Sequence, residues 1–235
     1  MKHPTETDAL GEFLISARSL AEYRAIFELS EADLRGRRIL DCPGGAASFA
    51  AEAAALDADV TATDPIYART AAELRELART ETERGSAYAG AHHTRYRWDF
   101  YGDPDNLQSV RLSAATRFGA DLTAHPDRYV AAQLPALPFQ DNSFDLALSS
   151  HLLFTYADRL DADFHLAALL ELARVTHGET RLYPLVDHTG HPQDNLVTYL
   201  RKSLHDKGIP TTLRPTGYEF HHGATTMLVL HPNQN

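Results

Sequence analysis

The 235-residue sequence has little of what several protein classes need. It contains a single cysteine, Cys42, which excludes an intramolecular disulfide and a CxxC metal site. No apolar run approaches the roughly 18 residues that span a bilayer. The first ten residues, MKHPTETDAL, are polar and lack the apolar core of a signal peptide. We therefore expect a soluble, cytoplasmic protein with no membrane partner.

Long basic runs are also absent, and the formal net charge is -10. A protein that binds the phosphate backbone normally presents a basic face, so we expect no nucleic-acid partner. The thirteen histidines include two adjacent pairs, but no HExxH pattern and no histidine pair at helical spacing with a carboxylate accompany them. We therefore expect no bound metal. The sequence does not indicate the oligomeric state.

Hydrophobic residues make up 43% of the chain, which is enough for a packed core. Short β-branched or apolar runs alternate with segments of helical periodicity, and this alternation predicts βαβ units in a mainly parallel sheet. Strands are expected from Ile39 and at 60–63, 129–132, 144–150 and 180–186, and helices at 12–29, 49–56, 68–83, 107–119, 161–175 and 195–207. Apolar runs around Leu213 and at 227–230 predict a terminal hairpin.

The second and third predicted strands are unusually far apart. About 65 residues separate Asp64 from Tyr129, whereas a plain crossover needs ~10–30. We therefore predict one domain over 1–235, with N-terminal helices within 1–36 and an inserted helical lid at 66–128.

The turn after the first strand, DCPGGAAS at 41–48, raises the question of the ligand. In a doubly wound sheet this turn forms the floor of the binding site, where the strand order reverses. A dinucleotide site needs G-x-G-x-x-G, because the backbone must approach a pyrophosphate closely. The turn lacks that pattern, which argues against NAD or FAD.

The same turn resembles the first motif, D-x-G-x-G-x-G, of the class I S-adenosylmethionine-dependent methyltransferases. Asp41 matches the acid and Gly45 the second glycine, whereas Pro43 and Ala47 stand at the other two glycines. The stretch LPALPFQDNSFDLALSS resembles the family's entry into the fourth strand. The resemblance implies a Rossmann-like, seven-stranded, mainly parallel sheet with helices on both faces and a C-terminal antiparallel hairpin. It also implies S-adenosyl-L-methionine as the cofactor.

The resemblance further implies roles for individual residues. Asp41 would face the cationic amino group of the methionine part, Asp64 would accept hydrogen bonds from both ribose hydroxyls, and Gln133 would meet the adenine amino group. Each has a plainer interpretation, since Asp41 could cap a helix and Asp64 could be a turn residue. Tyr23 could reach the cofactor from the N-terminal helix. The other expected cofactor contacts are Pro43, Gly44, Gly45, Pro65, Leu134 and Ser150.

A sulfonium is already activated, so holding the acceptor in line supplies most of the rate. His151 is the first candidate for a base or polar contact, and a merely structural histidine is the competing interpretation. Trp98 and Tyr156 are the other candidates for the reacting centre, because aromatic faces attract a cation. The N/D-P-P-Y/F sequence typical of amino-base methyltransferases is absent after the fourth strand.

Three hypotheses follow. The first is methyl transfer to a small-molecule substrate by in-line attack on the sulfonium. The second is aminocarboxypropyl chemistry with the same cofactor, either transfer or cyclisation to azetidine-2-carboxylate, with release of methylthioadenosine. The third is a cofactor-binding regulatory or scaffold protein without turnover. The sequence does not identify the acceptor or the carbon that is attacked.

Overall fold

The computed structural model describes residues 13–232. Seven strands form one sheet in the order β3-β2-β1-β4-β5-β7-β6. Strands β1 to β5 pair in parallel, whereas β7 runs antiparallel to both β5 and β6. The strands are β1 (Arg38–Asp41), β2 (Asp59–Thr63), β3 (Tyr129–Val130), β4 (Phe144–Ser150), β5 (Thr176–Tyr183), β6 (Thr211–Pro215) and β7 (Thr226–Leu230). The predicted fold class, including the terminal hairpin, is confirmed.

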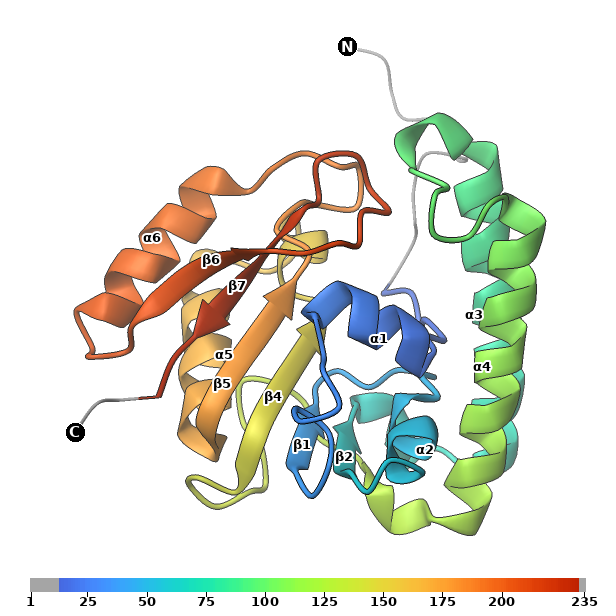
Figure 1. Ribbon diagram of the computed structural model, residues 1–235, viewed down its shortest axis with the longest axis horizontal. Coiled ribbons are helices and arrows are strands. Elements are labelled where there is room, and N and C mark those ends of the chain that lie inside the picture. Colours follow the sequence, from blue (N-terminus) through green and yellow to red (C-terminus); the bar gives the residue numbers. More distant parts are fainter. Residues whose placement is uncertain (1–12, 233–235) are drawn as a thin grey trace.

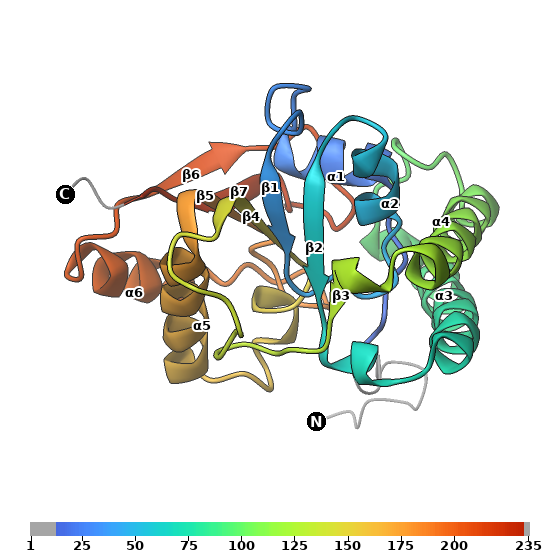
Figure 2. The same cartoon turned by 90° about the horizontal axis from the view of Figure 1, so that it is seen from below.

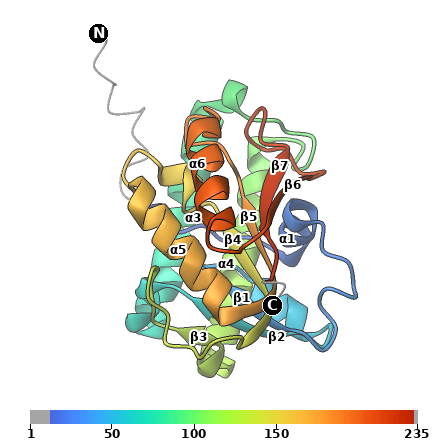
Figure 3. The same ribbon diagram turned by 90° about the vertical axis from the view of Figure 1, so that its left-hand side faces the viewer.

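Helices cover both faces of the sheet. Figure 2 shows the strands between α5 and α6 on one side and α1 and α2 on the other, and Figure 3 shows α5 and α6 over the near face. The helices are α1 (Leu20–Phe27), α2 (Phe49–Ala54), α3 (Ala71–Ala91), α4 (Pro104–Ala124), α5 (Ala162–Val175) and α6 (Asp194–His205). Within residues 13–232, no helix is both long and apolar enough to cross a lipid bilayer.

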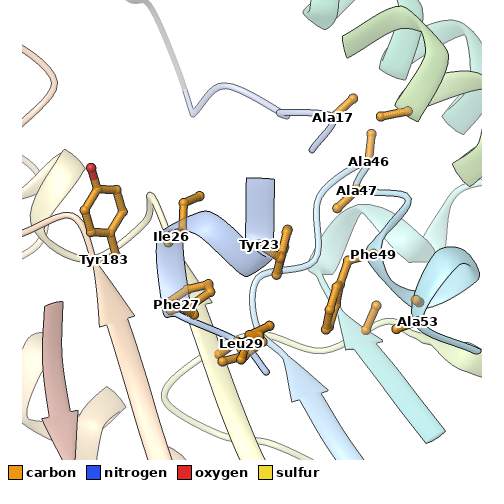
Figure 4. Close-up of a cluster of buried hydrophobic side chains, with 14 of the residues drawn as sticks. Ala17, Tyr23, Ile26, Phe27, Leu29, Ala46, Ala47, Phe49, Ala53 and Tyr183 are labelled. Carbon is orange, nitrogen blue, oxygen red and sulfur yellow. The ribbon is translucent and has the colours of Figure 1, made fainter. Parts of the chain in front are cut away.

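Each face of the sheet has its own buried apolar cluster. On the α1–α2 side, Tyr23 of α1 stacks on Phe49 of α2, with ring centroids 4.3 Å apart, and Figure 4 shows the two rings side by side. On the other side, Leu169 of α5 and Leu200 of α6 are fully buried in one cluster with strand residues such as Leu182 of β5. The sheet is therefore buried on both faces, as parallel sheets usually are.

The segment between β2 and β3 forms a helical insertion. Helices α3 and α4 lie side by side as a long pair (Figure 1), and they are next to β3 (Figure 2). Both are longer than predicted: α3 begins three residues later than expected but runs eight residues further, and α4 is extended at both ends. Thr70 forms a capping box with Glu73, and the Asp103 side chain accepts a hydrogen bond from Asn106 N just ahead of Pro104. Residues 84–91, which lie outside the predicted helices, therefore belong to α3.

The N-terminal helix is much shorter than the predicted 12–29. It begins at Leu20, because Ser19 and Glu22 form a capping box that fixes the helix start there. Residues 13–18 lie outside any helix, and residue 12 lies outside the described residues. The apolar spacing of Phe13 and Leu14 therefore comes from packing in an irregular segment rather than from helical periodicity.

Strand β5 begins at Thr176, four residues before the predicted start. The chain passes directly from the end of α5 into the strand, and Thr176 pairs with Phe144 of β4. The strand ends at Tyr183, ahead of Pro184, which has no backbone N–H to donate to a ladder.

Candidate functional site

A cavity of about 970 Å³ lies at the carboxyl ends of β1, β2 and β4, next to the point where the strand order reverses between β1 and β4. Sites for small molecules occupy roughly 300–1,000 Å³, so this cavity is large enough for a nucleoside and a second molecule. Eleven of the thirteen predicted site residues line it: Tyr23, Pro43, Gly44, Gly45, Asp64, Pro65, Gln133, Leu134, Ser150, His151 and Tyr156.

The two glycines of the β1–α2 turn are required by the protein's own packing. A Cβ at Gly44 would lie 2.5 Å from Tyr67 Oη and 2.8 Å from the Ala62 Cβ. Gly45 has a φ of +54°, and a Cβ there would lie 3.0 Å from Ser16 O. Tyr67 Oη also donates a 2.8 Å hydrogen bond to Gly45 O. The turn is therefore held against β2 and against the segment before α1.

Asp64 lies on the cavity wall with its carboxylate only 5% exposed. One oxygen accepts from Gly45 N and the other from Ile66 N, both at 3.1 Å. Burial raises the pKa of Asp64, while these two backbone hydrogen bonds oppose the rise. Each oxygen keeps a lone pair beyond the backbone bond it accepts. The carboxylate can therefore accept further bonds from neighbouring hydroxyls of a ligand in the cavity.

Asp41 does not line the cavity, although the sequence suggests a direct or water-mediated contact with the cofactor. It is buried at the end of β1, and Tyr23 Oη donates to its two oxygens at 2.8 and 3.0 Å. Tyr23 itself lines the cavity and so stands between Asp41 and a ligand. Burial raises the pKa of Asp41 to about 8, and the nearby Asp64 adds to the rise.

No ion pair joins Asp41 or Asp64 to a basic side chain in the described part of the chain, although Arg18 is near enough to lower the pKa of Asp41. The carboxyl groups of Asp64, on the wall, and of Asp41, behind Tyr23, disfavour an anion on this side, and a bound cation would oppose the rise in their pKa values. This side of the cavity is therefore suited to a positively charged ligand.

His151 follows β4 directly and lines the cavity with Ser150. Its φ is +53°, an unusual backbone conformation for a residue other than glycine. Ser150 Oγ lies 2.6 Å from His151 Nδ1. Burial, reinforced by the positive charges of Arg18 and Arg111, lowers the pKa of His151 well below its usual range. The imidazole is therefore neutral near pH 7.

Tyr156 contacts the segment 13–18 and holds it in place beside the cavity. Its hydroxyl accepts a 2.8 Å hydrogen bond from Leu14 N, and its ring packs edge-on against Phe13. The next backbone amide, Ile15 N, donates to Glu81 of α3 at 3.1 Å. Tyr156 therefore acts in this structure as an anchor for that segment as well as a wall of the cavity.

Trp98 is not brought to the cavity with the other candidates. It lies between η2 (His93–Arg95) and α4, where its Nε1 donates to His93 O at 3.0 Å and its ring meets Phe220 edge-on. An aromatic cluster that includes Tyr96 supplies this packing. Trp98 therefore does not line the large cavity, contrary to the expectation that it faces the reacting carbon. It is packed instead between the insertion and the terminal hairpin.

Several cavity residues escaped the sequence analysis. Arg18 and Glu81 line the cavity, but the sequence analysis placed them only within the predicted helices at 12–29 and 68–83. The i,i+4 spacing of Arg18 and Glu22 was the one available signal, but such pairs usually lie in solvent. Among residues 13–232, no group of three or more His, Cys, Asp or Glu side chains is arranged to hold a metal ion.

A family model described as a methyltransferase domain matches residues 105–183. The resemblance to the class I methyltransferase family is confirmed. The matched segment runs from α4 to the end of β5 and includes His151 and Tyr156, although it begins after the β1–α2 turn. The match thus covers β4 and the residues after it that line the cavity.

Several known proteins are similar to this chain in sequence or in fold. An uncharacterized protein of Methanocaldococcus jannaschii is 27% identical over 222 residues, which is 94% of this chain and 97% of that protein. The magnesium protoporphyrin IX methyltransferase of Synechocystis, solved with bound S-adenosylhomocysteine, has a TM-score of 0.47 at 13% identity, covering 91% of this chain and 81% of that one. The 1,6-didemethyltoxoflavin-N1-methyltransferase of Burkholderia thailandensis has a TM-score of 0.45 at 13% identity, covering 87% and 76%.

Proposed function

We propose that this chain is an S-adenosylmethionine-dependent methyltransferase that acts on a small molecule. The observation that carries the proposal is the cavity of about 970 Å³ at the switch point of the sheet, with the buried Asp64 on its wall and Asp41 behind Tyr23. The match of residues 105–183 to a methyltransferase domain supports the same conclusion. The size of the cavity supports a small acceptor lying beside the cofactor.

Asp64 would hold the ribose hydroxyls, and the turn at Gly44 and Gly45 would lie beneath the methionine part. Gln133 and Leu134 would contact the adenine from the loop that follows β3, with Gln133 able to accept from an amino group. S-adenosylmethionine, when bound, supplies a methyl group activated by its positively charged sulfur. Enclosure between the turn and residues 13–18 would exclude water from the reacting groups.

His151 would act as the base for an acceptor that carries a proton. With the Nδ1 proton donated to Ser150 Oγ, the Nε2 lone pair is free to take the acceptor's proton. The lowered pKa of His151 keeps this lone pair available at neutral pH. The acceptor must then approach along the side of the cavity formed by the end of β4.

Two measurements test this function. Calorimetry with S-adenosylhomocysteine should give a dissociation constant of about 1–100 μM, and undetectable binding to the folded protein would refute the proposal. Incubation with S-adenosylmethionine and a deproteinised small-molecule extract should yield S-adenosylhomocysteine on chromatography. Heat-denatured protein serves as the control for spontaneous breakdown of the cofactor.

The nucleoside product separates the remaining alternatives. Methylthioadenosine above the denatured control would replace methyl transfer by aminocarboxypropyl chemistry, in which the carbon γ to the carboxylate is attacked. Tight binding of S-adenosylhomocysteine without either product would favour a cofactor-binding protein that lacks turnover.

A further inference from the structure

A second, smaller cavity of about 90 Å³ adjoins the large one. It extends between α3, α4 and the loops that follow β4, β5 and β6, away from the β1–α2 turn. A single water molecule needs ~10–15 Å³ measured in this way, so the space accepts a group of several non-hydrogen atoms. The two cavities share the lining residues Leu14, Ser16, Arg18, Glu81, His151 and Tyr156.

Two arginines line the small cavity and share one carboxylate. Arg18 is 6% exposed and Arg111 is 9% exposed. The fully buried Glu22 lies 3.0 Å from Arg111 Nη2 and 3.8 Å from Arg18 Nε, and it is the ion-pair partner of both. Glu81, the acid that lines the cavity, pairs with Arg84 at 2.7 Å. The Arg18–Glu22–Arg111 cluster therefore keeps one positive charge that no carboxylate of the cluster balances.

Buried polar atoms without a hydrogen-bond partner gather around this space. Of the nine such side-chain atoms among residues 13–232, six belong to residues that line the small cavity. They are Arg18 Nε, Thr82 Oγ1, Arg111 Nε, Thr155 Oγ1, His188 Nδ1 and His221 Nδ1. A buried donor without a partner costs ~1–3 kcal/mol, and such a concentration is expected where a ligand supplies the missing acceptors.

The pKa values of two histidines that line the small cavity are lowered in part by the nearby arginines. Burial, reinforced by Arg18, lowers the pKa of His221 to about 4, although Asp187 opposes the shift. Arg18 and Arg111 likewise add to the effect of burial on His151. Burial disfavours any charge, but the part of both shifts that the arginines cause indicates a positive potential, and that potential attracts an anion.

We propose that the small cavity binds a compact oxyanion, a carboxylate or phosphate, carried by the acceptor substrate. The proposal rests on the proposed function, because it assigns the anion to the acceptor of that transfer reaction. Arg18 and Arg111 supply charge-assisted donors, and the Thr82 and Thr155 hydroxyls supply neutral ones. The aromatic walls, formed by Tyr96 and Phe220, fit an apolar body attached to the anion.

This anchoring would set the direction of the acceptor. His151 lines both cavities, so a molecule held by its anionic end in the small cavity extends past His151 into the large one. The arginines of the small cavity would thus select an acid as substrate, while Asp64 and Asp41 beside the β1–α2 turn would receive the cationic cofactor. The different charges of these two groups favour a different molecule at each.

Calorimetry on the full chain saturated with S-adenosylhomocysteine tests the site, with benzoate and inorganic phosphate as separate probes and benzamide as the neutral match. At least one anion should bind and benzamide should not. Arg111→Met should weaken that binding about tenfold or more, because a charge-assisted contact is lost. Arg117→Met, an exposed arginine on the same helix, is the matched control. No anion binding, or equal binding by the two variants, would overturn the proposal.

Loss of Arg111 also removes a partner of the buried Glu22, so that variant could fail to fold. Thr155→Val and His221→Phe leave the arginine–glutamate cluster intact and provide a second test. Each substitution should weaken anion binding by roughly three- to tenfold, which is the effect of losing one neutral hydrogen bond. Histidine NMR adds a specific readout, because the bound anion should raise the pKa of His221. An unchanged His221 titration in the anion-saturated protein would contradict the proposed location.

The cofactor's own carboxylate is the other source of such an anion. Arg111→Met should leave the affinities for S-adenosylhomocysteine and 5′-methylthioadenosine, which lacks the amino-acid part, in the same ratio as in the wild type. A selective tenfold loss for S-adenosylhomocysteine would assign the cavity to the cofactor and overturn the acceptor assignment, while the proposed function stands. If the wild type binds neither nucleoside, the proposed function itself fails.

Discussion

The proposed ribose contact of Asp64 leads to the sharpest prediction. In Asp64→Asn the side chain keeps its size and one acceptor oxygen but loses its charge, and its amide must face either Gly45 N or Ile66 N. Charge-assisted bonds to hydroxyls contribute ~1.5–3 kcal/mol. The variant should therefore bind S-adenosylhomocysteine roughly 10- to 100-fold more weakly than the wild type.

In this variant we expect the affinity for S-adenosylhomocysteine to fall while the stability of the fold stays nearly unchanged. Losing the bond to one backbone amide costs about 1 kcal/mol, while removing a buried charge whose pKa is raised offsets part of that cost. Thermal unfolding of Asp64→Asn should thus lie close to that of the wild type. Asp59→Asn, at the exposed start of the same strand, should change neither stability nor affinity.

Calorimetry with adenosine and 2′-deoxyadenosine identifies the contact itself. In the wild type the missing hydroxyl should weaken binding about tenfold, whereas Asp64→Asn should bind the two nucleosides with nearly equal affinity. If the variant still discriminates between them as strongly as the wild type, Asp64 does not hold the ribose, and the position of the cofactor in this cavity must be revised.

Three further predictions concern the surroundings of the site. Tyr23→Phe removes both hydrogen bonds to Asp41 and should lower the free energy of unfolding in urea by about 1–3 kcal/mol, whereas Tyr199→Phe, on an exposed ring, should not. The raised folded-state pKa of Asp41, about 8 against ~3.9 when unfolded, makes its contribution to stability largest below pH 4 and lost as the pH rises toward 8. Asp41→Asn should accordingly flatten the decline in stability between pH 5 and 8, and a decline as steep as in the wild type would assign it to other groups. Trp98→Phe should leave the affinity for S-adenosylhomocysteine within about twofold, since its ring packs on Phe220 away from the cavity; a loss of tenfold or more would contradict that position.

The sheet could be predicted because its signals are local. Periodicity and turn residues located most strands, and the long interval between Asp64 and Tyr129 indicated the insertion. The start of α1 was missed, because the capping box of Ser19 and Glu22 outweighs the apolar spacing that precedes it. The early start of β5 was missed as well, since no turn residue marks the change from helix to strand at Thr176.

The candidate site was predictable only where residues follow strands directly. Asp64, Ser150 and His151 stand at strand ends, and the topology brings those ends together. The buried arginines could not be predicted, because Arg111 and the exposed Arg117 lie in one helix and nothing in the local sequence distinguishes them. What distinguishes them is Glu22, 89 positions away from Arg111, and such a long-range contact has no signature in a single sequence.

The crowding around the β1–α2 turn bears on how distant relatives can be recognised. Within this turn, a side chain would be crowded by Tyr67 and Ala62 at Gly44 and by the Ser16 carbonyl at Gly45. Proline and alanine stand where the usual pattern has its other glycines, and the fold is intact. A search guided by a glycine doublet, together with a small residue on the neighbouring strand and a tyrosine just beyond it, would find chains that a three-glycine pattern passes over.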